Sequence, residues 1–249
     1  AFDYEVSTRI TVPADVQDAG TVLVLGRLLS DISRNLPAKP VEFSTSGNKV
    51  EVTCGSSRFS LMQMPEGDFP TLPTAPEASG TIDGGAFTQA VAQVAIAADR
   101  GDTLPILTGV RVEIDGDKMT LLATDRYRLA MRELHWNPAA TDANQVLLVP
   151  GRTLLDTAKS LGTTGSIDLA FGGAAGGDGL VGFEAGQRRS TTRLLDGEYP
   201  KVSSIFPTSS ETEVVLATAE LVEAVKRVAL VAERNTPVRL KFGQGHVTI

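Results

Sequence analysis

The chain has 249 residues, of which 42% are hydrophobic and 21% charged, and its formal net charge is −7. This length allows one large domain or two smaller ones with a substantial core, and the acidic balance taken alone argues against bulk attraction to nucleic acid. The single cysteine, Cys54, excludes an intrachain disulfide and a cysteine-based metal cluster, and no apolar run is long enough to span a membrane.

Both ends of the chain are expected to be strands. Residues 1–12, AFDYEVSTRITV, begin within a strand-like stretch, and residues 238–249, VRLKFGQGHVTI, stop within another. An unpaired strand leaves backbone groups without partners, so we expect the sequence to be a fragment of a longer protein. Cys54 also lies in an alternating strand, where it is expected to be a small buried hydrophobe.

One set of motifs occurs twice in the same order. The offset between the partners grows from 122 to 134 residues, as loop insertions would produce, and this indicates the duplication of a whole domain rather than a short solenoid repeat. The matched segments are 1–3 with 123–125, 21–36 with 146–161, 58–70 with 189–200, and 86–100 with 220–234.

The middle of the chain shows the order of elements within one repeat. The expected elements are a helix at 86–98, strands at about 108–115 and 118–124, an arginine-alternating strand within 123–131, a helix at 151–161, and strands at 166–171, 180–184 and 188–195. The strands alternate apolar and polar residues, and the helices carry apolar residues at i, i+3 and i+4. Helices on one face of antiparallel sheets define an α+β fold.

The repeat also predicts the domain boundaries. Residues 1–77 are the back half of one unit, 80–207 are a complete unit, and 213–249 are the front half of a third. Two proline-rich stretches, 69–80 and 199–210, are the expected linkers. The glycine-rich segment 172–179 lacks the Lys-Ser/Thr of a phosphate loop and is predicted to be a flexible hairpin.

Asp125 lies in the segment ATDRYRLAM, 123–131, which could be a catalytic motif, a nucleic-acid contact or a strand with one solvent-exposed face. Catalysis would require a second carboxylate or a histidine at working distance. Asp3 occupies the equivalent place in another repeat, so an active site of this kind would be scattered over separate domains. We therefore expect Asp125 to bond to the backbone at the start of the strand.

The segment ATDRYRLA also resembles the ATDGHRLA-type signature of bacterial beta sliding clamps, the beta subunits of DNA polymerase III. Other matching segments are LTGVRVE at 107–113, LVPGRTLLD at 148–156, RFSL at 58–61 and FPTLP at 69–73. The resemblance implies a ring of two chains with three similar domains each, in which helices line the central hole and sheets form the outside. The front of domain one and the back of domain three would be missing from this sequence.

Positive charge is concentrated in the expected helices. The net charge is +2 in residues 25–39, 0 in 84–100, +1 in 151–161 and 0 in 219–234. The net negative charge of the chain therefore lies outside these helices. A sliding ring needs only a mildly positive lining, because each further phosphate contact adds salt-dependent affinity. Arg27 and Arg34 are seven residues apart, which is two helical turns, and so are Arg152 and Lys159; each pair therefore lies on one face of its helix. The alternative to a DNA-binding role is that these faces are only solvated surface. The resemblance implies that the DNA-facing residues are Arg27, Arg34, Arg100, Arg152, Lys159, Lys226 and Arg227.

The resemblance further implies a pocket that receives short linear motifs of partner proteins. An apolar pocket at a domain junction can take a Leu or Phe anchor, while cations at its rim hold backbone and acidic groups. The matching residues are Leu107, Thr124, Arg126, Tyr127, Arg128, Leu129, Pro200, Ser204 and Ile205. This sequence departs from the commonest family pattern at Arg126, Tyr127 and Ser204, which affects the rim and the motif preference.

The function implied by the resemblance is that of a DNA sliding clamp, a processivity factor without an active site, cofactor or metal of its own. Its expected partners are double-stranded DNA, the replicative polymerase, the clamp loader, other clamp-motif proteins and a second copy of the chain, in the cytoplasm and away from membranes. The alternatives are a non-catalytic interaction module without a DNA role, and a hydrolase or phosphoryl-transfer enzyme that uses Asp125.

Overall fold

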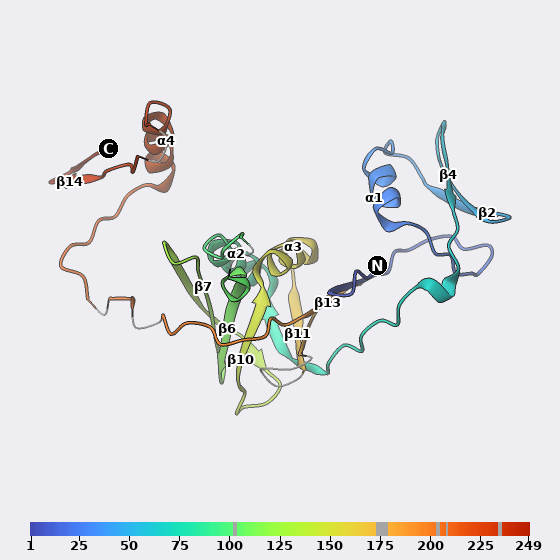
Figure 1. The fold of residues 1–249 in the computed structure, drawn as a ribbon, viewed down its shortest axis with the longest axis horizontal. Helices are drawn as coiled ribbons and strands as arrows, with labels where there is room; N and C mark the ends of the chain where they lie inside the picture. Colours follow the sequence, from blue (N-terminus) through green and yellow to red (C-terminus); the bar gives the residue numbers. More distant parts are fainter. Residues whose placement is uncertain (102–103, 173–178, 203–204, 208, 234–235) are drawn as a thin grey trace. The chain divides into compact units, whose positions relative to one another are not determined.

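The structure, a computed structural model, describes residues 1–249 except 102–103, 173–178, 203–204, 208 and 234–235. The described residues form two compact units, Ala1–Tyr199 and Pro200–Ile249 (Figure 1).

A four-stranded antiparallel sheet forms one part of the larger unit. Its strand order is β10-β6-β7-β8, and the strands are β6 (Gly109–Asp115), β7 (Lys118–Thr124), β8 (Leu129–His135) and β10 (Asn144–Pro150). Successive side chains of a strand point to opposite faces, so the alternation in β6 buries Val110, Val112 and Ile114. The strand predicted at 118–124 is confirmed, and the strand predicted from 108 begins at Gly109.

A six-stranded antiparallel sheet forms a second part, with the order β1-β13-β12-β11-β5-β9. Its strands are β1 (Val6–Ile10), β5 (Ala78–Asp83), β9 (Asn137–Pro138), β11 (Ser166–Gly172), β12 (Leu180–Ala185) and β13 (Arg188–Arg193). The three strands predicted between 166 and 195 are confirmed, with ends shifted by one or two residues. The predicted linker 69–80 is too long, because its last three residues belong to β5.

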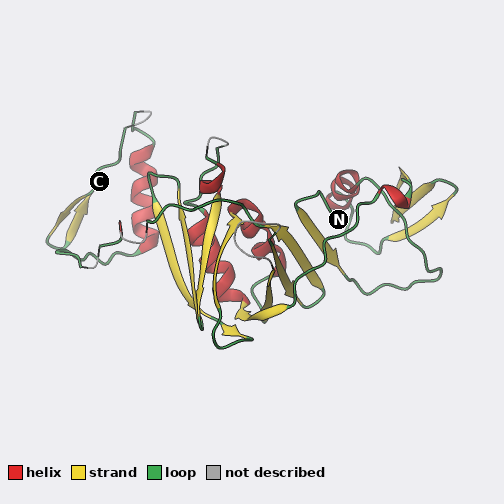
Figure 2. Cartoon of the chain, turned by 60° about the horizontal axis from the view of Figure 1, so that its bottom comes forward, coloured by secondary structure: helices red, strands yellow, loops and turns green. Residues whose placement is uncertain are grey.

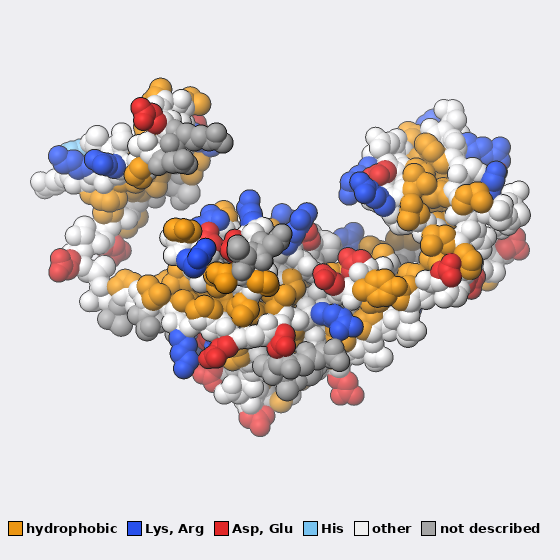
Figure 3. Space-filling model, viewed as in Figure 1, with side chains coloured by type: hydrophobic (Ala, Val, Ile, Leu, Met, Phe, Trp, Pro, Cys, Tyr) orange, Lys and Arg blue, Asp and Glu red, His pale blue; other side chains and the backbone are white. Residues whose placement is uncertain are grey.

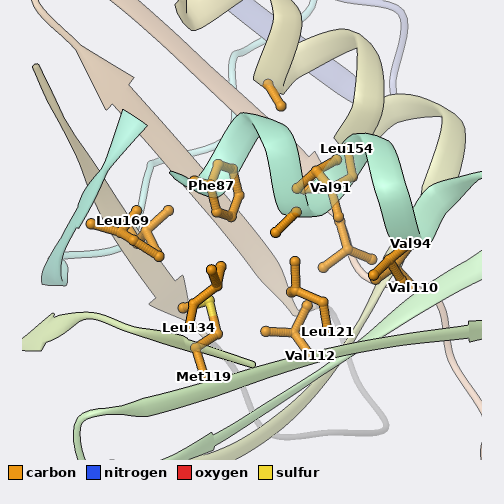
Figure 4. Close-up of a cluster of buried hydrophobic side chains, with 14 of the residues drawn as sticks. Phe87, Val91, Val94, Val110, Val112, Met119, Leu121, Leu134, Leu154 and Leu169 are labelled. Atoms are coloured by element: carbon orange, nitrogen blue, oxygen red, sulfur yellow. The ribbon is translucent and has the colours of Figure 1, made fainter. Parts of the chain in front are cut away.

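Two helices, α2 (Gly84–Ala95) and α3 (Gly151–Leu161), pack against each other and against strands of both sheets (Figure 2). Phe87, Val91 and Val94 of α2 and Leu154 of α3 point into one core that also includes residues of both sheets (Figure 4). Full burial of a side chain of this size contributes about 1.5–3 kcal/mol. The α+β arrangement expected from the periodicity is therefore confirmed, and so are the bounds of the helix at 151–161.

The helix predicted at 86–98 begins two residues earlier and ends three residues earlier. The carboxylate of Asp83 accepts a hydrogen bond of 2.8 Å from the backbone N–H of Ala86, so Asp83 is the N-cap. After Ala95 the N–H groups of Ala97 and Ala98 donate to carbonyls three residues back, which tightens the last turn and ends the α-helix.

The N-terminal part of the larger unit contains α1 (Gly26–Arg34), a sheet of β2 (Glu42–Ser46), β3 (Lys49–Cys54) and β4 (Ser57–Met62), and the 3-10 helix η1 (Glu66–Asp68). Ile32, Val52 and Leu61 form its small core. Cys54 is fully buried, with its sulfur 3.4 Å from the carbonyl oxygen of Pro37, so the expectation for this residue is confirmed.

The prediction that a strand begins at the first residue is wrong, because β1 begins only at Val6. The predicted hairpin at 172–179 joins β11 to β12, which pair antiparallel from Gly172 and Leu180, but its residues 173–178 lie outside the described part of the chain. The smaller unit contains α4 (Thr218–Ala229) and a hairpin of β14 (Lys241–Gly243) and β15 (His246–Thr248).

Candidate functional site

The segment ATDRYRLAM is a turn between two strands and not one alternating strand. Strand β7 ends at Thr124 and β8 begins at Leu129, and these two residues pair across the hairpin. Arg126 adopts a φ of 79°, in the left-handed region that breaks a strand. The prediction of an arginine-alternating strand is therefore wrong. Residues 125–128, here called the docking turn, present their side chains from a loop.

Asp125 holds the docking turn together. Its Oδ1 accepts hydrogen bonds of 3.0 Å from the backbone N–H groups of Tyr127 and Arg128, and its Oδ2 accepts one of 2.8 Å from the Arg128 Nε. Desolvation acts to raise the pKa of Asp125, but the two backbone donors and the Arg128 guanidinium outweigh it and lower the pKa. The expectation that Asp125 bonds to the backbone is confirmed, although it closes a turn rather than starting a strand.

The first residues of the chain form the same turn. The Oδ1 of Asp3 accepts from the backbone N–H groups of Glu5 at 3.1 Å and Val6 at 2.7 Å, and Tyr4 has a φ of 75°. Each donor lies two or three residues after its aspartate, as in the docking turn, and the left-handed residue follows the aspartate directly in both. The two turns are thus equivalent in backbone geometry as well as in sequence.

Thr124 connects the docking turn to a residue far along the chain. Its hydroxyl donates to the carbonyl of Arg128 at 2.7 Å and accepts from the N–H of Arg126 at 3.1 Å. Its own backbone N–H donates to the hydroxyl oxygen of Tyr199 at 2.9 Å. Tyr199 is only 3% exposed, and burial raises the pKa of its phenol, while the Thr124 N–H and the charge of Arg111 act in the opposite direction.

Tyr199 was not among the site residues predicted from the sequence. The available signal was the aromatic-proline pair, which the two repeats share as Phe69-Pro70 and Tyr199-Pro200. That signal predicted a linker but not a hydrogen bond, because only the Tyr199 copy carries a hydroxyl and its partner is 75 residues away.

The predicted pocket residues differ in exposure. Leu107 is buried within the 3-10 helix η2 (Pro105–Thr108), Thr124 is buried, and Leu129 is half-buried at the start of β8. Arg126, Tyr127 and Arg128 of the docking turn are exposed. Tyr127 is 90% exposed, and the Arg126 guanidinium carbon lies 5.9 Å from the centroid of the Tyr127 ring. An exposed aromatic ring with a cation over its face can contact a partner through both groups.

Three of the residues predicted for the pocket fall in the smaller unit. Pro200 and Ile205 are exposed, and Ser204 lies outside the described residues.

The predicted DNA-facing residues are all exposed. Arg152 and Lys159 lie on α3 among positions that are not part of the core, and Figure 3 shows lysine and arginine side chains gathered over the region where Figure 1 labels α2 and α3. In α1, Arg27 and Arg34 are exposed while Ile32 between them is buried. The remaining three residues, Arg100, Lys226 and Arg227, are likewise exposed. Lys226 forms an ion pair of 3.2 Å with Glu223.

Within the described part of the chain, no group of three or more His, Cys, Asp or Glu side chains is placed to hold a metal ion. None of the described helices has both the length and the apolar composition that a membrane span requires.

Three family models match the chain in sequence order. They are the DNA polymerase III beta subunit N-terminal domain at residues 1–73, the central domain at 81–201 and the C-terminal domain at 203–249.

Relatives and solved structures give the same result. The chain is 58% identical to a beta sliding clamp of Streptomyces coelicolor, over 98% of this chain and 65% of that protein. It is 56% identical to a beta sliding clamp of Micrococcus luteus, over 100% of this chain and 79% of that protein. Among solved structures, a DNA polymerase sliding clamp of Bacillus subtilis is 26% identical with a TM-score of 0.78, covering 94% of this chain and 63% of that one. The DNA polymerase III beta subunit of Pseudomonas aeruginosa bound to griselimycin is 27% identical with a TM-score of 0.79, covering 92% and 62%.

The chain thus spans about two thirds of the length of several of these proteins, 65% in the case of the Streptomyces coelicolor relative. The identity to the Micrococcus luteus protein extends over the whole chain and 79% of that relative. The repeated Asp-centred turn, the helix pair and the antiparallel sheets accompany this identity in the structure. This chain belongs to the beta sliding clamp family, the beta subunits of DNA polymerase III.

Proposed function

We propose that this chain is part of a DNA sliding clamp, which encircles duplex DNA and tethers the replicative polymerase and other partners to it. The observation that carries the proposal is the face of α3, where Arg152 and Lys159 are exposed while Leu154 and Ala158 are buried against the core. The helix therefore separates a cationic outer side from an apolar inner side. Exposed cations on a helix face suit sequence-independent contact with phosphates.

The modest charge of this face is suited to sliding. The window 151–161 carries only +1, and a protein held on DNA by topology does not need many phosphate contacts. Because each neutralised phosphate makes affinity more dependent on salt, a small number of contacts leaves the protein free to move along the duplex.

The proposed assembly is a ring of two copies in the cytoplasm, loaded by a clamp loader. The proposed domains are 1–77, 80–207 and 213–249, the first and last being parts of clamp domains. The proposal includes no catalytic residue, since the protein acts as an accessory subunit of the polymerase. Support comes from the names of the relatives, which are beta sliding clamps, and from the domain-sized repeat.

The docking turn is proposed to hold partner peptides. Leu107 and Leu129 would contact an apolar anchor, and Arg126, Tyr127 and Arg128 would form the rim. The network of Asp125 and Thr124 supports this role, because it fixes the backbone of the turn before a peptide arrives. A pre-ordered site loses less conformational entropy on binding.

Loading onto circular DNA tests the proposal. The full-length protein that contains this chain, incubated with clamp loader, ATP and a nicked circle, should co-elute with the circle at high salt and dissociate when the circle is linearised. The double variant Arg152→Ala/Lys159→Ala should reduce the retained fraction while its melting temperature stays close to wild type, because exposed charges contribute little stability.

The matched control is Lys118→Ala, a cation on β7 that forms an ion pair with Glu133 on β8. It should leave DNA retention unchanged. An equal loss of DNA retention in Lys118→Ala would mean that the overall positive charge, and not the α3 face, determines retention. Absence of salt-resistant retention in the wild type would refute the clamp and leave the interaction module without a DNA role.

A further inference from the structure

A groove of about 250 Å³ lies beside β1 in the larger unit, between the six-stranded sheet and the segment that leads into β5. Its sheet side includes Ser7 and Arg9 of β1 and Arg189 of β13. Its other side includes Leu72 and Ala75. This volume is below the roughly 300–1,000 Å³ of pockets for drug-sized ligands, so the groove has room for only one or two side chains.

The groove is the counterpart of the predicted docking pocket in the other repeat. Ser7 pairs with Phe2 across the Asp3 turn, as Leu129 pairs with Thr124 across the docking turn. Ala75 follows Pro70 by five residues, as Ile205 follows Pro200. Two positions that correspond to predicted pocket residues thus line an existing groove.

The residues at these two positions favour a different occupant. Serine and alanine replace the leucine and isoleucine, so a large apolar anchor would bury less surface here. Leu72 and Ala75 are half-buried and leave only a short apolar wall. Recognition in this groove must therefore depend more on polar and charged groups than in the docking pocket.

The charge at the groove is positive on its β1 side. Arg9 and Arg189 are directly opposite each other on β1 and β13, and like charges in that position are destabilising. Arg189 is neutralised from its other side by Glu184, with a hydrogen bond of 2.7 Å from its Nε. Among the residues that the structure describes, Arg9 has no ion-pair partner. A carboxylate beside Arg9 would neutralise it from its outer side, as Glu184 neutralises Arg189.

We propose that this groove binds a short extended peptide in which an acidic residue lies next to a small or medium apolar residue. The carboxylate accepts from the Arg9 guanidinium, whose planar fork matches a carboxylate, and the apolar side chain contacts Leu72 and Ala75. The inference depends on the proposed docking function only for the kind of occupant, since the groove and its charges are features of the larger unit itself.

An NMR titration of the purified protein with the peptide Ac-Ala-Glu-Val-Asp-Ala-NH2 tests the inference. We expect backbone amide shifts at Ser7, Thr8 and Thr191, three residues of the groove, and weaker binding as salt is raised. The neutral twin Ac-Ala-Gln-Val-Asn-Ala-NH2 should bind at least tenfold more weakly, because a hydrogen bond to a charged group contributes more than one to a neutral group. Equal binding of the two peptides would overturn the inference.

Three variants determine whether the peptide occupies this groove. Arg9→Gln should weaken peptide binding about tenfold and leave DNA retention unchanged. Arg132→Gln, an exposed arginine of β8, should bind as wild type does, and equal loss would mean unspecific attraction. Leu129→Ala should also bind as wild type does, whereas loss would place the peptide in the docking pocket. Displacement of the peptide by inorganic phosphate at equal concentration would indicate an anion site and refute peptide recognition.

Discussion

Replacing Tyr199 by phenylalanine removes one hydroxyl group and leaves the aromatic ring in place. In the wild type this hydroxyl accepts the backbone N–H of Thr124 at 2.9 Å, in a buried position. The variant leaves that N–H without a partner, and an unsatisfied buried donor costs about 1–3 kcal/mol. For a protein of this size about 1 kcal/mol shifts the melting temperature by roughly 2–4 °C, so we expect a decrease between about 2 and 12 °C.

Urea unfolding followed by the fluorescence of Trp136, which is buried in the core of the larger unit, measures the free energy of unfolding. Hydrogen exchange of the Thr124 amide provides the local readout and should accelerate in Tyr199→Phe, since its acceptor is gone. The matched control is Tyr127→Phe, which removes the same hydroxyl from a side chain that is 90% exposed and should change neither quantity. An unfolding free energy within about 0.3 kcal/mol of wild type, together with unchanged Thr124 exchange, would refute the reasoning.

The burial of Tyr199 predicts sensitivity to alkali. Burial raises the pKa of the Tyr199 phenol above its ordinary value of 10.0. A raised pKa means that the folded state favours the neutral phenol, so this contribution to stability is complete below pH 10 and is lost as the pH rises through the folded pKa. The stability difference between wild type and Tyr199→Phe should therefore narrow above pH 10, which urea unfolding at several pH values would measure.

Three further predictions concern the turn and its surroundings. Asp125→Ala removes the carboxylate that accepts hydrogen bonds from the backbone N–H groups of Tyr127 and Arg128. Because the pKa of Asp125 is lowered below 3.8 in the folded state, the contribution of Asp125 to stability is complete above pH 3.8 and is lost as the pH falls through the folded pKa. The difference in unfolding free energy between wild type and Asp125→Ala should therefore narrow in acid. In the full-length protein, Leu129→Ala should weaken the binding of a Gln-x-x-Leu-Phe-type peptide about tenfold or more in calorimetry while folding is preserved, and unchanged affinity would contradict the docking role. Gly80→Ala should unfold at a much lower temperature, because a Cβ there would lie 2.4 Å from the Asn137 carbonyl oxygen at a φ of 157°, whereas Gly26→Ala meets no atom within 4 Å and should melt near wild type.

Local sequence determined the helices and most of the strands. Helix α3 has the predicted bounds 151–161, because its apolar stripe at Leu154, Ala158 and Leu161 has the helical period and Gly162 follows its end. Strand β7 also has its predicted bounds, since alternation and the Asp-Gly turn before it are short-range signals. The repeat of the aspartate motif is evident in residues 1–3 and 123–125, although the sequence predicts the start of a strand there and the hydrogen bonds form a turn.

Only the tertiary structure decided how these elements combine at the candidate site. The alternation in Arg126, Tyr127 and Arg128 predicted a strand, but the hydrogen bonds of Asp125 and the left-handed φ of Arg126 make it a turn, because side-chain acceptors can outcompete a strand over so short a stretch. The bond from Thr124 to Tyr199 spans 75 residues.

The pairing of β1 with β13 is longer in range still, since it places Arg9 opposite Arg189. Neither contact has a sequence signal of its own, because residues so distant along the chain meet only after each has been fixed in a separate element. The sequence therefore predicted which residues are exposed and cationic, and the packing of the sheets determined which of them face one another.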